Sequence, residues 1–169
     1  MFTTRLPRTF LALLLFWAMG QTLAQEASPA PSLYVQANWA KRGTDAYTWG
    51  ATLPWREWSQ PLGDGELHGH WDIYLSRWHF DGAPGSSHRL TLLGVTPTLR
   101  LRPDSGHSAW FLEAGIGGTL ASRRYYTVHK KFSTRFNFAS HVGVGIYLGA
   151  QQQHELLLRV QHVSNASIK

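Results

Sequence analysis

The chain has 169 residues, and its 16 lysines and arginines outnumber its 10 aspartates and glutamates, which gives a formal net charge of +6 at pH 7. It has no cysteine, so disulfide bonds are excluded as a source of stability. The main apolar run, at residues 10–17, is too short to cross a membrane as a helix, which needs about 20 apolar residues.

The first 24 residues have the three parts of a secretory signal peptide. Arg5 and Arg8 form a positive segment, residues 10–17 (FLALLLFW) form a short apolar segment, and residues 22–24 (TLA) form a cleavage site of small residues. We therefore expect a signal peptide at residues 1–24 and one domain at residues 25–169.

Apolar and polar residues alternate through most of the remaining chain. Alternation predicts strands with one apolar face, because successive side chains of a strand point to opposite sides. Most of the alternating stretches are close to the length of a tilted membrane strand, about 9–11 residues. There are seven of them: 33–39, 47–55, 67–76, 93–102, 110–117, 135–148 and 156–164.

The face opposite the apolar residues is small, polar and rich in glycine, as a narrow barrel lumen requires. A soluble β-sandwich or lipocalin would turn its apolar face inward, and alternation alone does not separate these folds. The signal peptide, the aromatic strand ends and the small polar face favour an all-β fold, a small antiparallel transmembrane β-barrel of the bacterial outer membrane. Bacterial barrels have even strand numbers, so we expect eight strands in the full protein, about seven of them here and the last beyond Lys169. A miscounted first strand is the alternative.

The turns predict which strand ends lie together. Residues 103–106 and 149–152 are short and have turn chemistry, and residues 60–65 fall on the same, periplasmic side. Residues 80–87 and 122–131 then fall on the outer side. The last strand runs outward and ends near the outer leaflet.

That last stretch carries a histidine and a serine on its apolar face. Leu156, Leu158, Val160, His162 and Ser164 share this face, and Leu157, Arg159, Gln161 and Val163 point the other way. Histidine and serine are the general base and nucleophile of serine hydrolases, and at positions i and i+2 their side chains are adjacent. In a membrane barrel the pair would lie on the outer wall facing lipid, where an esterase for a lipid substrate needs its chemistry.

The string HVSNA at residues 162–166 resembles the H-x-S-N-A signature of the lipid A 3-O-deacylase (PagL) family of outer-membrane enzymes. The signal peptide, the small-barrel pattern and the position near the end of the chain match that family as well. The resemblance implies that Ser164 is the nucleophile and His162 the general base, while Asn165 positions the site or lines the oxyanion pocket. It also implies a glutamate as third member, so we expect the triad acid beyond Lys169 and the 169-residue chain by itself to be inactive.

Several charged residues point to the predicted lumen. Glu113 and Glu155 are poor substitutes for the triad acid, because both lie on the polar face and Glu155 is near the opposite end of its strand. His68, His70 and Asp72 share a face, which suggests either metal ligation or a hydrogen-bond network in the lumen. We favour the network, since the family resemblance implies no metal and no other cofactor.

A basic cluster lies in and beside the expected outer stretch 122–131: Arg123, Arg124, His129, Lys130, Lys131 and Arg135. The natural anion for an outer-membrane protein is the phosphorylated glucosamine of lipopolysaccharide, which charge-assisted contacts would bind. Arg123, Arg124, Lys130 and Lys131 are therefore candidate ligands of the substrate phosphates. The alternatives are a plain solvated loop and the nucleic-acid binding open to any basic patch; we expect no nucleic-acid partner.

The leading hypothesis is a carboxylic ester hydrolase that removes the acyl chain from the 3-position of a lipid A glucosamine, with lipopolysaccharide and membrane lipid as its partners. The alternatives are a non-enzymatic small barrel, structural or adhesive, and a palmitoyl-transferring barrel. The latter would need its catalytic groups on outer loops. The sequence leaves open which acyl chain is removed and whether the protein is a monomer or a homodimer.

Overall fold

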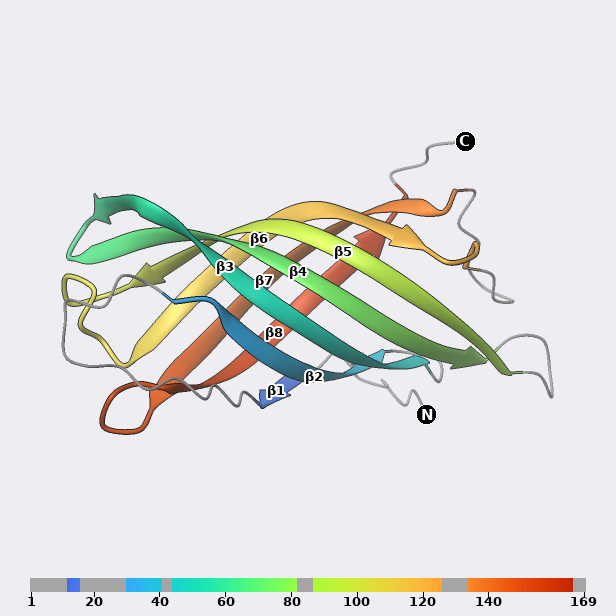
Figure 1. Ribbon diagram of the computed structural model, residues 1–169, viewed down its shortest axis with the longest axis horizontal. Coiled ribbons are helices and arrows are strands. Elements are labelled where there is room, and N and C mark those ends of the chain that lie inside the picture. The colour runs from blue at the N-terminus through green and yellow to red at the C-terminus, as the bar shows by residue number, and fades with distance from the viewer. Residues whose placement is uncertain (1–11, 16–29, 41–43, 82–86, 126–133, 166–169) are drawn as a thin grey trace, which may run out of the picture.

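The computed structural model describes residues 12–15, 30–40, 44–81, 87–125 and 134–165. These residues form β1 (Ala12–Leu15), β2 (Ser32–Ala40), β3 (Thr44–Leu62), β4 (Gly65–Asp81), β5 (Ser87–Arg102), β6 (Trp110–Ala121), β7 (Phe136–Leu148) and β8 (His154–Ser164). Each strand pairs antiparallel with the next, and the sheet closes into a barrel in the order β1 to β8 (Figure 1). The predicted all-β antiparallel barrel is therefore confirmed. In this part of the chain, no helix is long and apolar enough to span a membrane.

The seven predicted stretches correspond to β2 through β8. The eighth position, between β2 and β8, is taken by the four residues of β1. β1 pairs with Val35–Asn38 of β2 and with Leu156–Arg159 of β8. It lies within the residues expected to form the signal peptide, which stays a prediction.

Strands β3 and β4 are longer than predicted, at 19 and 17 residues. Their register shifts between Pro54, which pairs with His70, and Ser59, which pairs with His68, so residues 55–58 face the single residue Gly69. The Trp55 ring lies over Gly69, where an added β-carbon would come within 1.9 Å of the ring. This bulge interrupts the two-residue alternation, which is why the pattern ended the strand at residue 55.

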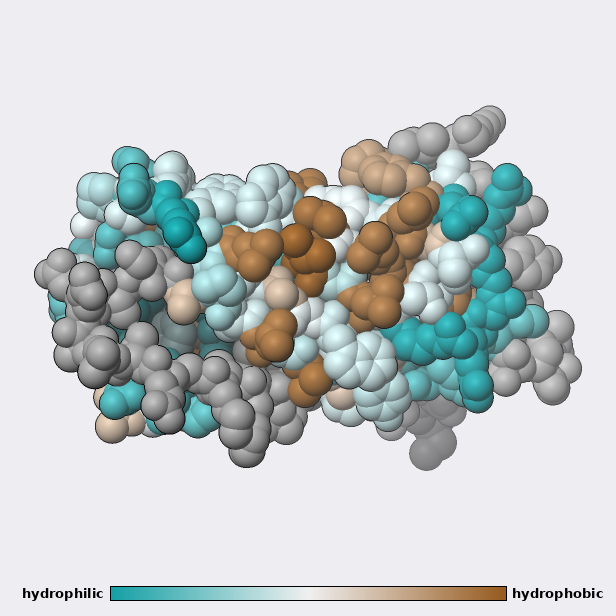
Figure 2. All heavy atoms as spheres, viewed as in Figure 1, coloured by the Kyte–Doolittle hydropathy of each residue, from teal (hydrophilic) through white to brown (hydrophobic). Residues whose placement is uncertain are grey.

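The outward face of the barrel is apolar. Trp49, Trp71, Val144 and Leu158, which alternation predicts to face outward, have exposed fractions from 37% for Leu158 to 53% for Trp49. Ile73, predicted to be exposed with them, is half-buried. Figure 2 shows hydrophobic residues across the middle of the barrel and hydrophilic residues toward its ends on the face in view. A water-soluble barrel would bury these large apolar side chains. Their exposure on the outer wall is the arrangement expected of a barrel that is surrounded by lipid.

Glycines in the lumen make room for aromatic rings. A β-carbon at these glycines would come within 2.2–2.3 Å of the opposite ring, so no larger residue fits without displacing it. Each ring stands directly across from its glycine on the next strand: Tyr34 opposite Gly50, Tyr74 opposite Gly94, and Phe111 opposite Gly145. These three glycines of the lumen face are thus each packed against an aromatic ring of a neighbouring strand.

The connections between strands lie at the two barrel ends in the arrangement predicted from the sequence of the turns. The turns after β3, β5 and β7 lie at one end, since those strands run in the same direction. β8 ends at the opposite end, where β6 also ends and β7 begins. The candidate residues at the end of β8 therefore share that end with the last residues of β4 and β6.

Candidate active site

The two faces of β8 differ sharply in burial. Leu157 and Arg159 are 1% and 3% exposed, whereas Leu158 and Val160 are 37% and 42% exposed. His162 continues the outward series and is exposed, and Ser164 on the same face is half-buried. The structure therefore has both residues on the outer wall of the barrel.

His162 and Ser164 are separated by a single inward-facing residue. A strand rises about 3.3 Å per residue, so their α-carbons are about 6.6 Å apart and their side chains are neighbours on one face. Asn165 follows directly after β8 and is half-buried. The three residues thus form one short segment at the end of a strand.

The neighbouring strand β7 supplies the surroundings of this segment. Ser140 stands directly across from His162, and Phe138 stands across from Ser164. Phe138 and Phe136 are exposed and pack edge to face, with their ring centroids 5.3 Å apart. Ser164 therefore lies beside an exposed aromatic surface, which suits contact with an acyl chain better than contact with water.

The predicted basic cluster is only partly described. Arg123 and Arg124 follow β6 at the same end of the barrel as Ser164, and both are exposed. The Arg135 Nε donates a hydrogen bond to the Ala121 carbonyl oxygen at 2.8 Å. His129, Lys130 and Lys131 lie outside the described residues.

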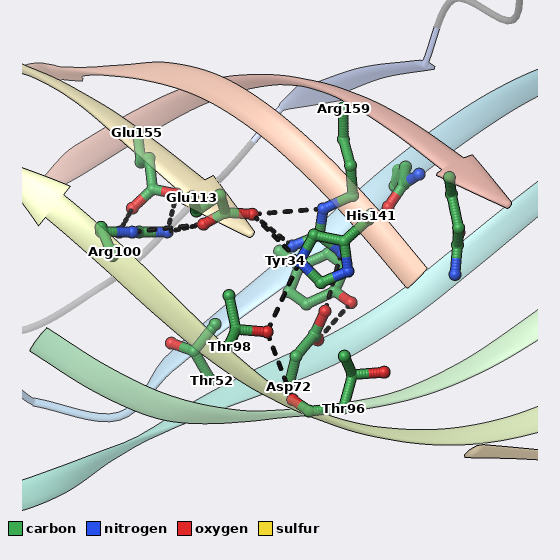
Figure 3. A network of polar contacts seen from close by, with 12 residues as sticks. Tyr34, Thr52, Asp72, Thr96, Thr98, Arg100, Glu113, His141, Glu155 and Arg159 are labelled. Carbon is green, nitrogen blue, oxygen red and sulfur yellow. Dashed lines mark hydrogen bonds and ion pairs between the residues drawn. The ribbon is translucent and has the colours of Figure 1, made fainter. Parts of the chain in front are cut away.

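Behind the outer wall, the lumen holds a chain of ion pairs (Figure 3). Arg159 of β8 binds Asp72 of β4 and Glu113 of β6, each with a nitrogen–oxygen distance of 2.7 Å. Arg100 of β5 binds the other Glu113 oxygen and Glu155 of β8, again at 2.7 Å. Two arginines and three carboxylates are thus paired in alternation, so burial leaves none of these charges without an opposite partner.

Hydroxyl groups extend this chain of ion pairs. Tyr34 donates a hydrogen bond to Asp72 at 2.6 Å, and Arg100 donates one to the Tyr147 hydroxyl at 2.8 Å. The alternation of polar residues placed the charges on the lumen face, as expected for Glu113 and Glu155. It did not predict which charges meet, because partners on β4, β6 and β8 are brought together only by closure of the barrel.

The carboxylates of these ion pairs lie on the lumen side of the barrel wall, whereas the candidate nucleophile lies on its outer side. Strands β6, β7 and β8 carry two acids, Glu113 and Glu155, and both point into the lumen with arginine partners. Neither lies on the face of His162, in agreement with their interpretation as poor triad acids.

The three residues weighed as metal ligands have separate roles. Asp72 is fully buried and bound to Tyr34 and Arg159, and His70 is buried near it in the lumen. His68 lies near the start of β4, and its Nε2 is 3.3 Å from a carboxylate oxygen of Glu66. Across the described ranges, no group of three or more His, Asp or Glu side chains is arranged to hold a metal ion.

Comparison with known proteins adds the identity of the family. The family model described as Lipid A 3-O-deacylase (PagL) matches residues 45–169, which is more than half of the chain and includes both His162 and Ser164. Searches of curated proteins and of solved structures found no match. The family is one of outer-membrane enzymes that act on lipid A. The chain belongs to the lipid A 3-O-deacylase (PagL) family.

Proposed function

We propose that this protein is an outer-membrane serine esterase that hydrolyses the 3-O-linked acyl ester of lipid A. The observation that carries the proposal is the position of His162 and Ser164 on the outward, apolar face of β8, beside the exposed Phe136 and Phe138. A membrane-bound ester can reach a nucleophile on this face without leaving the lipid. Family membership supplies the substrate class.

In the proposed reaction, the Ser164 hydroxyl oxygen attacks the acyl carbonyl carbon while His162 accepts the hydroxyl proton. The resulting oxyanion is stabilised by hydrogen-bond donors, among which we place the Asn165 side-chain amide. The ester bond to the sugar then breaks, and the 3-oxygen leaves with the proton held by His162. Water, deprotonated by His162, attacks the acyl-enzyme and releases the fatty acid, which restores the serine.

The acid that orients His162 is proposed to lie outside the described residues. Asp72, Glu113 and Glu155 are bound to arginines inside the barrel and face away from His162. Binding of the substrate phosphates is assigned to the basic segment after β6, with Arg123 and Arg124 as its described members. We also propose that residues 1–24 are a signal peptide that directs export.

The proposed activity is tested by incubating the purified, refolded full-length protein with lipid A in mixed micelles and analysing the products by mass spectrometry. We expect the loss of one acyl group from the 3-position, with release of an equal amount of free fatty acid. Transfer of an acyl chain to another lipid without release of fatty acid would instead support the palmitoyl-transferring alternative. Unchanged lipid A would favour the non-enzymatic barrel.

Membrane insertion is tested by placing a charge at two depths on β7. Val144 lies in the interior of the strand and Leu148 at its end beside a turn, and their exposed fractions are nearly equal at 45% and 44%. In lipid vesicles, Val144→Arg should cost about 2–4 kcal/mol of folding free energy and Leu148→Arg about 0–1 kcal/mol. Urea titrations of tryptophan fluorescence measure both. Equal costs at the two depths would contradict a lipid-facing wall.

A further inference from the structure

Every inward side chain of β8 from Glu155 to Gln161 is held by another strand. Glu155 binds Arg100 of β5, and Leu157 packs in the cluster formed with Tyr34, Tyr74 and Phe111. Arg159 binds Asp72 and Glu113. Gln161 donates a hydrogen bond to the Tyr74 hydroxyl of β4 at 3.0 Å.

Two of these contacts cross the whole lumen. In a barrel closed in the order β1 to β8, β4 is four strands from β8 in either direction, so the two strands are opposite each other. Arg159–Asp72 and Gln161–Tyr74 nevertheless join them directly, at 2.7 and 3.0 Å. Asp72 and Tyr74 are alternate residues of β4, as Arg159 and Gln161 are of β8, so the two contacts lie side by side.

The hydrogen bond of Gln161 lies next to the candidate catalytic pair in the sequence. Among the described residues, β7 pairs with β8 as far as Ser164. Gln161 directly precedes His162. Its side chain points into the lumen and is held there by the Tyr74 hydroxyl of β4.

We propose that Gln161 is a positioning residue for the reaction. Its bond to Tyr74 holds the β8 backbone from the lumen side, and this fixes the direction in which His162 projects toward Ser164 on the other side. Arg159 anchors the same strand two residues earlier. The inference rests on the proposed esterase function, since it assigns a role in placing the general base.

The first test removes the bond from each side. Gln161→Leu removes the donor, and Tyr74→Phe removes the acceptor without any change to β8. Small errors in the placement of a catalytic group lower the rate of the chemical step more than they lower binding, so we expect kcat to fall about 10-fold and KM to change less than about twofold. The double variant should be no slower than either single variant, because all three lack the same bond.

A rescue and a control separate positioning from stability. Gln161→Glu can accept a hydrogen bond from the Tyr74 hydroxyl, so it should retain more kcat than Gln161→Leu, and this advantage should vanish in the Tyr74→Phe background. Thr48→Val removes a buried hydrogen bond between Thr48 and Ser76, 2.7 Å long, which joins β3 to β4 and does not touch β8. It should leave kcat unchanged even where it lowers the urea midpoint.

The outcomes distinguish this inference from the function on which it rests. If Ser164→Ala is inactive but Gln161→Leu and Tyr74→Phe keep the full kcat, the positioning role is wrong and the esterase stands. If Thr48→Val lowers kcat as much as Gln161→Leu, the effect is one of general stability and the inference fails. If Gln161→Leu does not fold, Tyr74→Phe still tests the inference, because the same loss of kcat is expected of it. Retained activity in Ser164→Ala would overturn the proposed function itself.

Discussion

In the full-length protein, Ser164→Ala is expected to abolish the release of fatty acid from lipid A while leaving the barrel folded. The variant lacks the proposed nucleophilic oxygen, and the loss should be roughly 10⁴-fold or more, as in soluble serine hydrolases. His162→Ala should have a comparable effect, because no base then accepts the hydroxyl proton. Mass spectrometry of lipid A measures the activity, and heat-dependent migration on gels measures folding.

The structure provides a matched control for the nucleophile. Ser140 on β7 stands directly across from His162, so it is a second hydroxyl close to the proposed base. Ser140→Ala should retain near-normal activity, because Ser140 lies outside the segment that carries the family signature. The reverse result, an inactive Ser140→Ala and an active Ser164→Ala, would move the nucleophile to β7.

Arg159→Met is expected to cause the largest loss of stability. Arg159 is 3% exposed and is bound to both Asp72 and Glu113, so its removal leaves Asp72 buried without its cationic partner. Breaking a buried ion pair from one side costs about 3–5 kcal/mol. The free energy of unfolding, measured by urea titration in detergent, should fall by that amount.

Two further variants check this explanation. Adding Asp72→Asn to Arg159→Met removes the orphaned charge, so the double variant should recover part of the lost free energy. Arg77→Met removes an exposed arginine that donates a hydrogen bond to Thr91 at 2.7 Å, and it should cost about 1 kcal/mol or less. Equal losses for Arg159→Met and Arg77→Met would mean that the ion pairs of the lumen contribute little to stability.

The sequence predicted the strands and their faces because both are local properties. Alternation with period two decides which side chains of a strand share a face, and this was enough to put Trp49, Val144 and Leu158 outside and Glu113 inside. The same reasoning put His162 and Ser164 together on the outer wall. Neither result needs knowledge of which strands are neighbours.

The contacts across the lumen could not be predicted in the same way. Whether Arg159 meets Asp72 depends on the number of strands, their stagger and the closure of the sheet, and a shift of register by two residues keeps every face but changes every partner. The extension of β3 past Trp55 was missed because four residues of the bulge face one residue of β4, which breaks the period. The glycines were recognised as small, but the rings above Gly50, Gly94 and Gly145 appear only when the partner strand is known.

The two contacts between β8 and β4 also bear on the shape of the barrel in cross-section. A ring of hydrogen-bonded strands can flatten into an ellipse while every ladder stays intact, because bending between strands breaks no backbone bond. The Arg159–Asp72 ion pair and the Gln161–Tyr74 hydrogen bond connect opposite strands across one diameter of the barrel, so they should resist this flattening. Curvature at the wall sets how far outward side chains on adjacent strands splay apart. We therefore expect these contacts to limit changes in the spacing between the outer surfaces of β7 and β8, where Phe138 and Ser164 lie side by side.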